Sequence, residues 1–233
     1  MAAGCWLAEP SLWGGKSRAW LCGPSTHPEH GNMTACDTLL VVIDAQRAFV
    51  DPAGSLARAY GVDELQPSVD ALVRLRTHLG QCAAGTRPVF VRSEYRRGQF
   101  TGGRLDHPLA DLCVPGRNLD CEWAAGLDTT RASAIITKQQ ADAGETEAYR
   151  TVVERAVRDG VRQIVLTGFQ LTTCIRVSAL ATVGLVGARG ARVVVAEALA
   201  GARASSYVQT ATGSRVDATR RELRAAGVLV AQN

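Results

Sequence analysis

Cys174 stands where a buried strand is predicted to give way to a helix, a position suited to a nucleophile. An apolar run at 164–166 is interrupted by Gly168, and small and apolar residues recur at helical spacing from Cys174 onward. Because the first turn of a helix has unpaired N–H groups and a positive dipole, we expect the pKa of Cys174 to fall below its free value of about 8.5. A buried structural cysteine is the alternative.

Two charged residues stand at the predicted ends of other strands. Asp44 follows the apolar run TLLVVI at 38–43, where a carboxylate is costly unless it is paired. Lys138 follows a strand predicted at 132–137 and is one of only two lysines among 26 basic residues, the other being Lys16. Because the chain uses arginine almost everywhere else, a lysine at a strand end indicates a chemical role. Chance retention at a surface position is the alternative.

Together these three residues suit nucleophilic catalysis. Ligands of parallel α/β sheets bind outside the carboxyl ends of the strands, so Asp44, Lys138 and Cys174 are expected to share one crevice. There Asp44 would take the thiol proton, and Lys138 would stabilise the thiolate by its charge. The thiolate would then attack a carbonyl carbon to form an acyl-enzyme. Asp44 would pass its proton to the leaving amine and activate water.

The elements that must position these residues alternate along the chain. Strands are predicted at 38–43, 88–91, 132–137, 164–167, 192–196 and 228–230, and helices at 65–79, 146–159, from 174 onward and at 205–226. This order predicts an α/β fold: a three-layer Rossmann-like sandwich with an about six-stranded, mostly parallel sheet and helices on both faces. A long irregular excursion at 96–128 suits a lid or substrate wall. No glycine-rich phosphate motif supports a dinucleotide or nucleoside triphosphate site.

Composition separates residues 1–36 from the rest. They hold three of the four tryptophans and three of the seven cysteines without periodicity, so we predict an irregular or disordered extension before one domain at 37–233. An arm that packs on a partner subunit is the alternative. Met33 precedes a normal lead into the first strand, which leaves it open whether 1–32 belong to the native protein.

Charge and cysteine content exclude several kinds of partner. The net charge of +4 is spread over 26 basic and 22 acidic residues without a basic stripe, so no nucleic acid is expected. Since no apolar run approaches the roughly 18 residues of a membrane span, no membrane is expected either. An odd number of cysteines without C-x-x-C spacing predicts free thiols and a cytoplasmic location.

From about residue 37 onward the chain resembles the isochorismatase-like cysteine hydrolases, which include nicotinamidase and N-carbamoylsarcosine amidase. The matching segments are VVIDAQRAF at 41–49, ITK at 136–138 and TGFQLTTCI at 167–175. The resemblance implies a catalytic triad of Asp44, Lys138 and Cys174. It also implies a cis peptide between Phe169 and Gln170, and an oxyanion hole formed by the amides of Gln170 and Cys174.

We assign substrate binding to residues near the first two strand ends: Gln46, Phe49, Arg92, Glu94 and Tyr95. The resemblance further implies a homodimer or homotetramer without a cofactor. Because the segment RSEYRRGQF at 92–100 lacks the histidines of metal-binding nicotinamidases, we predict no metal. Leu171 stands where the family usually has a threonine or serine, so one polar contact near the turn is lost or is replaced by Thr172 or Thr173. Glu197 replaces an aspartate of the family, a change that we interpret as structural.

The predicted function is hydrolysis of a C–N amide, lactam or carbamoyl bond of a small molecule. True isochorismatases cleave a vinyl ether and lack the nucleophilic cysteine, so Cys174 favours amide chemistry. Two alternatives stay open, namely an isochorismatase-type vinyl ether hydrolase and a non-catalytic binding member of the fold.

Overall fold

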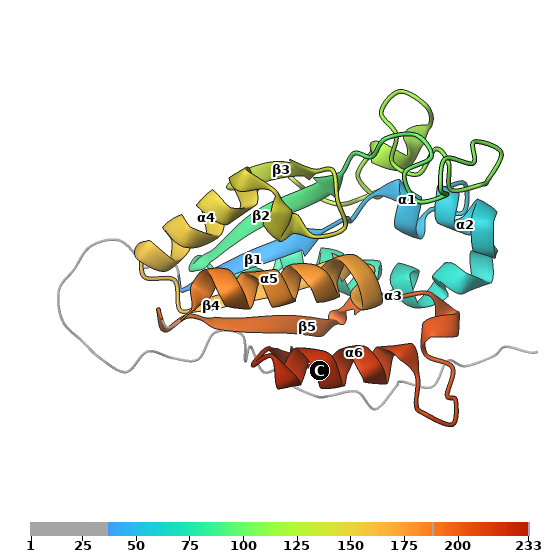
Figure 1. The fold of residues 1–233 in the computed structure, drawn as a ribbon. Coiled ribbons are helices and arrows are strands. Elements are labelled where there is room, and N and C mark those ends of the chain that lie inside the picture. Colours follow the sequence, from blue (N-terminus) through green and yellow to red (C-terminus); the bar gives the residue numbers. More distant parts are fainter. Residues whose placement is uncertain (1–36, 188, 233) are drawn as a thin grey trace, which may run out of the picture. The chain divides into compact units, whose positions relative to one another are not determined.

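A six-stranded, all-parallel sheet forms the centre of the fold, in the order β3-β2-β1-β4-β5-β6 (Figure 1). The computed structural model describes residues 37–187 and 189–232, so the predictions about 1–36 lie outside the described residues. The strands are β1 (Thr38–Ile43), β2 (Thr86–Ser93), β3 (Ala134–Lys138), β4 (Gln163–Phe169), β5 (Arg192–Gly201) and β6 (Leu229–Ala231). The predicted α/β class is confirmed.

Helices cover both faces of this sheet. They are α1 (Arg47–Val50), α2 (Ser55–Tyr60), α3 (Gln66–Gly80), α4 (Glu147–Arg158), α5 (Arg176–Val186) and α6 (Arg215–Ala225). Shorter turns are the 3-10 segments Val62–Leu65, Leu119–Cys121, Ala143–Glu145 and Ala204–Ser206 and the π-helical turn Leu171–Ile175. In Figure 1, α4, α5 and α6 lie on one face, and α3 lies on the other.

The first strand shows why the sheet is a rigid base for a site. Leu39, Val41 and Ile43 join the apolar cluster formed with α4, α5 and α6, while Leu40 and Val42 point to the opposite face; all five side chains are almost completely buried. Burial of one such side chain is worth about 1.5–3 kcal/mol. The end of β1, where Asp44 follows, is therefore firmly placed.

Several elements differ from those predicted. The helix expected at 205–226 begins only at Arg215, because the Ser214 side chain and Asp217 form a capping box. β5 continues past 196 to Gly201 after a register shift between the β4 residues Leu166 and Gly168. The turn that carries Cys174 is π-helical, and α5 begins after it at Arg176.

The predicted excursion lies between β2 and β3. In residues 94–133 the only helical or strand segment is the short turn Leu119–Cys121. Hydrogen bonds nevertheless tie both ends of the excursion to the sheet: Glu94 N donates to Lys138 O at 2.9 Å, and Ser133 N donates to Pro88 O at 2.8 Å. It is a structured loop that follows the carboxyl end of β2.

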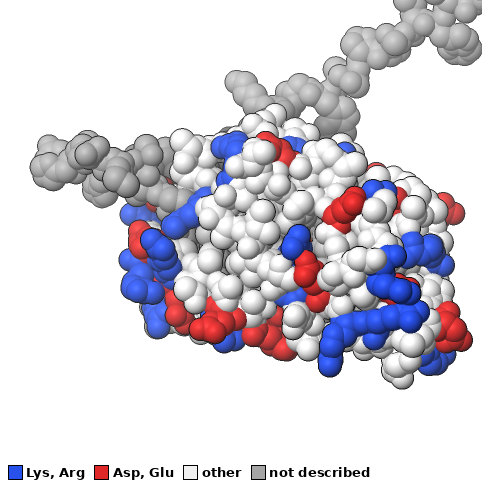
Figure 2. Space-filling view, turned by 90° about the horizontal axis from the view of Figure 1, so that it is seen from above, with Lys and Arg blue, Asp and Glu red and all other residues white. Residues whose placement is uncertain are grey.

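Charged side chains of both signs lie close together on the face drawn in Figure 2. Many form ion pairs, as when Asp111 accepts from both Arg97 and Arg117. None of the helices in the described part of the chain has the length and apolarity that crossing a bilayer requires.

Candidate active site

Three strand ends bring polar side chains together at the carboxyl edge of the sheet. Ser93 and Lys138 are the last residues of β2 and β3 and are register partners. Asp44 directly follows β1, and its N–H donates to Val91 O at 2.7 Å. Its φ of 53° lies in the left-handed region, which aspartate tolerates better than most residues. The chain therefore turns at Asp44 as it leaves the sheet.

Asp44 and Lys138 form an ion pair that is wholly removed from water. Lys138 Nζ lies 2.9 Å from Asp44 Oδ2, and both side chains are 0% exposed. Burial acts to lower the pKa of Lys138, but the charges of Asp44 and Cys174 outweigh it, so this pKa is raised. Lys138 is accordingly a fixed positive charge. Such a pair persists only where hydrogen bonds satisfy the remaining polar atoms.

Three hydrogen bonds use the three ammonium protons of Lys138. Nζ donates to Ser93 Oγ at 2.7 Å, to Tyr95 OH at 3.1 Å and to Gln140 O at 3.0 Å. The Ser93 hydroxyl in turn donates to Asp44 Oδ1 at 2.8 Å. Asp44 Oδ2 accepts no aligned hydrogen bond within the described part of the chain, although it lies close to the ammonium. This oxygen faces the ammonium and can accept a proton.

Cys174 lies in the π-helical turn after β4 and is 5% exposed. Burial raises the pKa of Cys174 to about 11; the charge of Lys138 opposes this rise, and Asp44 adds to it by its charge and a hydrogen bond. The prediction that this pKa is lowered is wrong, because burial destabilises the thiolate more than the positive charge of Lys138 stabilises it. At neutral pH Cys174 is a thiol that needs a base.

The turn before Cys174 depends on one glycine. A Cβ atom at Gly168, whose φ is 106°, would lie 2.0 Å from Ile43 O, so only glycine lets β4 approach β1 here. The peptide between Phe169 and Gln170 is cis. Gln170 O then accepts from the N–H groups of Thr173 and Ile175 at 3.1 and 3.2 Å, which closes the turn.

Gln46 lies beside this cluster, but its amide bonds to the backbone. Its Oε1 accepts from Ser93 N at 2.7 Å, and its Nε2 donates to Ser93 O at 3.0 Å and Cys121 O at 3.2 Å. The side chain is wholly buried. Gln46 therefore fixes the end of β2, and a substrate contact by Gln46 stays a prediction.

The other residues assigned to substrate binding differ in exposure: one pair is partly exposed, and two aromatic side chains are buried. Arg92 and Glu94 pair with each other, with Nη2 and Oε1 2.7 Å apart, and are partly exposed. Phe49 is buried in α1. Tyr95, in contrast, is only 4% exposed and lies in the hydrogen-bond network of Lys138.

Ser93 was not predicted from the sequence. Its signal was the two-residue alternation of a strand, which puts Val91 and Ser93 on the same face. A small polar residue on a buried face at the end of a strand needs a partner. The Ser93 hydroxyl has three partners: Lys138, Asp44 and Tyr95.

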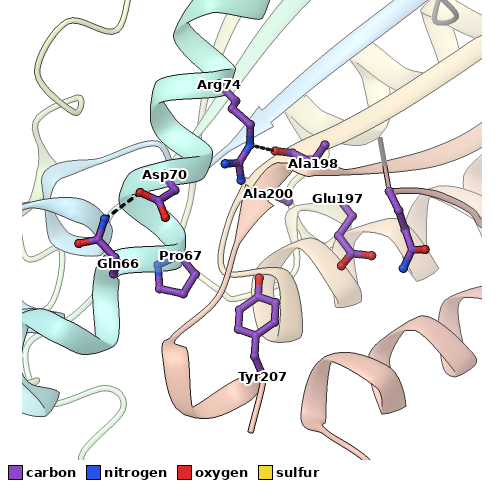
Figure 3. Close-up of a pocket in the computed structure, with 9 residues that line it drawn as sticks. Gln66, Pro67, Asp70, Arg74, Glu197, Ala198, Ala200 and Tyr207 are labelled. Atoms are coloured by element: carbon purple, nitrogen blue, oxygen red, sulfur yellow. Dashed lines mark hydrogen bonds between the residues drawn. The ribbon is translucent and has the colours of Figure 1, made fainter. Parts of the chain in front are cut away.

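A separate hollow of about 330 Å³ lies between α3 and the irregular part of β5 (Figure 3). Arg74 Nε donates to Ala198 O across it at 2.6 Å, and the ring of Tyr207 forms part of its wall. Its lining includes none of the predicted site residues. Glu197, on its rim, forms a bidentate ion pair with Arg220, which gives this residue a structural contact.

Within the described residues, no group of three or more His, Cys, Asp or Glu side chains is arranged to hold a metal ion.

Comparisons with known proteins identify a family and a shared fold. The isochorismatase domain model matches residues 38–223. Similar solved structures include PnC1 from L. infantum in complex with nicotinate, with 20% identity and a TM-score of 0.60 over 87% of this chain and 96% of that chain.

The same fold occurs in a nicotinamidase/pyrazinamidase of Acinetobacter baumanii, with 18% identity and a TM-score of 0.60 over 86% of this chain and 98% of that chain. It also occurs in a cysteine hydrolase of Pseudomonas syringae pv. phaseolicola, with 19% identity and a TM-score of 0.60 over 89% and 94% of the two chains. No curated protein sequence matches the chain significantly.

Proposed function

The chain belongs to the isochorismatase family, and on that premise we propose that it is a cysteine hydrolase that cleaves a C–N bond of a small, non-peptide amide. One observation supports the proposal: Ile43 and Gly168 are register partners at the carboxyl ends of β1 and β4, so the turn that bears Cys174 follows the strand next to the one that leads to the buried Asp44–Lys138 ion pair. The pKa of Cys174 responds to both charges, which supports their proximity to the thiol.

The first half of the reaction forms an acyl-enzyme. Asp44 takes the proton of the Cys174 thiol on Oδ2, to which no aligned hydrogen bond is donated by the residues that the structure describes. The thiolate, stabilised by the ammonium of Lys138, attacks the carbonyl carbon of the amide. The oxyanion accepts hydrogen bonds from the amide N–H groups of Gln170 and Cys174. When the C–N bond breaks, Asp44 returns its proton to the leaving amine, and a thioester on Cys174 remains.

The second half regenerates the thiol. Asp44, again a carboxylate, takes a proton from a water molecule whose oxygen attacks the thioester carbon. The C–S bond then breaks, and the acid product leaves while Asp44 returns the proton to Sγ. Lys138 transfers no proton in either half; it acts as a fixed charge, consistent with its raised pKa and its saturated hydrogen bonds.

Amine release from a panel of amides, lactams, ureides and carbamoyl compounds tests this proposal. We expect turnover of at least one class by the wild-type protein and none by Cys174→Ala. Cys121→Ala is the matched control, because burial raises the pKa of that thiol to about 11 as well, yet it belongs to no part of the proposed triad. Amine release that persists in Cys174→Ala contradicts the proposal, because the C–N bond would then be cleaved without a cysteine nucleophile.

A further inference from the structure

Asp120 carries a buried carboxylate that the proposed mechanism does not use. The residue is 2% exposed. Within the described residues its two oxygens accept from two backbone N–H groups: Oδ1 accepts from Ser55 at 3.1 Å, and Oδ2 accepts from Cys113 at 3.3 Å. Burial of a carboxylate costs free energy unless hydrogen bonds satisfy it. These two bonds therefore hold Asp120 in place, and they connect two segments that are far apart in the sequence.

The bond to Cys113 leads to the ammonium of Lys138. Cys113 is wholly buried and has a φ of 49°, a left-handed conformation that few residues other than glycine adopt. Its N–H donates to Asp120, and its carbonyl oxygen accepts from Tyr95 N at 2.9 Å. The Tyr95 hydroxyl oxygen accepts from Lys138 Nζ at 3.1 Å and lies 2.6 Å from Ser93 Oγ. A chain of hydrogen bonds thus connects Asp120 to Lys138 through Cys113 and Tyr95.

The segment that follows Asp120 lies beside the chain that leaves β1. Arg47 N donates to Glu122 O and Ala124 N donates to Ala45 O, each at 2.9 Å. These backbone bonds fix the position of residue 120 relative to the end of β1. Through its carboxylate, Asp120 then fixes the turn at Cys113 relative to the same strand end.

We propose that Asp120 is a positioning residue for the Asp44–Lys138 pair: its carboxylate holds the left-handed turn at Cys113, and that turn holds Tyr95 against Lys138. This inference rests on the proposed function and adds to it a residue outside the triad. An aspartate suits this role because both of its oxygens accept hydrogen bonds, whereas an asparagine has one acceptor and one donor. Asp120→Asn therefore keeps the shape of the side chain and loses one of the two backbone bonds.

The test follows the Lys138 ammonium by NMR of the ¹⁵N-labelled full chain. Its protons exchange with water only when the hydrogen bonds that protect them open, and the chain has only one other lysine, Lys16, which simplifies the assignment. A lost hydrogen bond to a charged group changes an equilibrium by about tenfold or more. We expect Asp120→Asn to speed exchange of the ammonium protons and of the Tyr95 amide by at least that factor.

Asp217→Asn is the matched control. This carboxylate also accepts from a backbone N–H group, that of Ser214 at 3.3 Å, but it does so in the first turn of α6. Its replacement removes the same charge and should leave the Lys138 ammonium signal unchanged. An unchanged signal in Asp120→Asn, or an equal change in Asp217→Asn, overturns the inference.

Exchange of the Cys113 amide in the wild type decides the question if Asp120→Asn does not fold. Slow exchange supports a turn that Asp120 holds, and exchange as fast as that of an exposed loop amide overturns it. These measurements need no substrate, so their failure is distinguishable from amine release that persists in Cys174→Ala.

Kinetics test the connection through Tyr95. With an amide that the wild type hydrolyses, Asp120→Asn should lower kcat about tenfold and leave KM unchanged, because the proposed role is to place the pair and not to bind substrate. Tyr95→Phe keeps the backbone bond to Cys113 and removes the hydroxyl that contacts Lys138. Adding Asp120→Asn to Tyr95→Phe should therefore lower kcat no further, whereas additive losses contradict a role through Tyr95.

Discussion

Ser93 and Lys138 are register partners at the ends of β2 and β3, and Lys138 Nζ donates a 2.7 Å hydrogen bond to Ser93 Oγ. Because Ser93 also donates to Asp44 Oδ1, one hydroxyl connects the ends of three strands. The carboxylate that we propose as the acceptor of the thiol proton is therefore oriented by a serine that the family motifs of the sequence did not include.

Replacing this serine should weaken catalysis more than folding. Ser93→Ala leaves Asp44 Oδ1 without its donor, and a hydrogen bond to a charged group is worth about 1.5–3 kcal/mol. We expect kcat/KM to fall about tenfold or more in an amine-release assay. Ser133→Ala is the control, because that hydroxyl donates to Pro88 O away from the strand ends that carry the site. Wild-type kcat/KM in Ser93→Ala would show that Asp44 needs no such orientation.

Lys138→Met should damage both stability and turnover, since it leaves the buried Asp44 carboxylate without its counter-charge. Loss of one partner of a buried pair costs about 3–5 kcal/mol. Adding Asp44→Asn should return most of the stability and none of the activity, as measured by urea unfolding and amine release. If the double variant is as unstable as the sum of the two single variants, the two residues are not coupled.

The raised pKa of Cys174 predicts a pH dependence of stability. The folded protein keeps this thiol proton up to pH about 11, whereas the unfolded chain releases it above its ordinary value of 9.0. Unfolding therefore becomes easier as the pH rises from 9 toward 11, and Cys174 contributes about 2 kcal/mol to that fall. The difference in unfolding free energy between the wild type and Cys174→Ala should shrink over this range. A constant difference would mean that the pKa is not raised.

A chain that starts at Met33 should fold and keep its activity, because the composition of 1–32 offers no periodic apolar face to bury. Circular dichroism on heating and the amide assay measure both properties. A shortened chain that no longer unfolds cooperatively would assign the tryptophans of that segment to the core or to an interface.

The sequence predicted the sheet well because buried parallel strands carry continuous apolar runs. The first strand was located to the residue at Thr38–Ile43. β5 was predicted too short, since its register shift and the Glu197–Arg220 contact arise between elements far apart in the chain. Local patterns do not encode such contacts.

The site was predicted less completely than the sheet. Asp44 and Lys138 were placed at strand ends, and the structure pairs them at 2.9 Å. The shift in the pKa of Cys174 was predicted in the wrong direction. The burial that raises it depends on tertiary contacts, which the local sequence of the turn does not show. Ser93 was missed for a similar reason, since its role is set by the register of two neighbouring strands.

The most direct test of the central claim is the mass of the protein stopped in acid during turnover of an amide that it hydrolyses. We predict an added acyl group on the peptide that contains Cys174, accumulating before steady state and absent from Cys174→Ala. Steady amine release without an adduct on Cys174, together with turnover in Cys174→Ala, would contradict the assignment of Cys174 as the nucleophile.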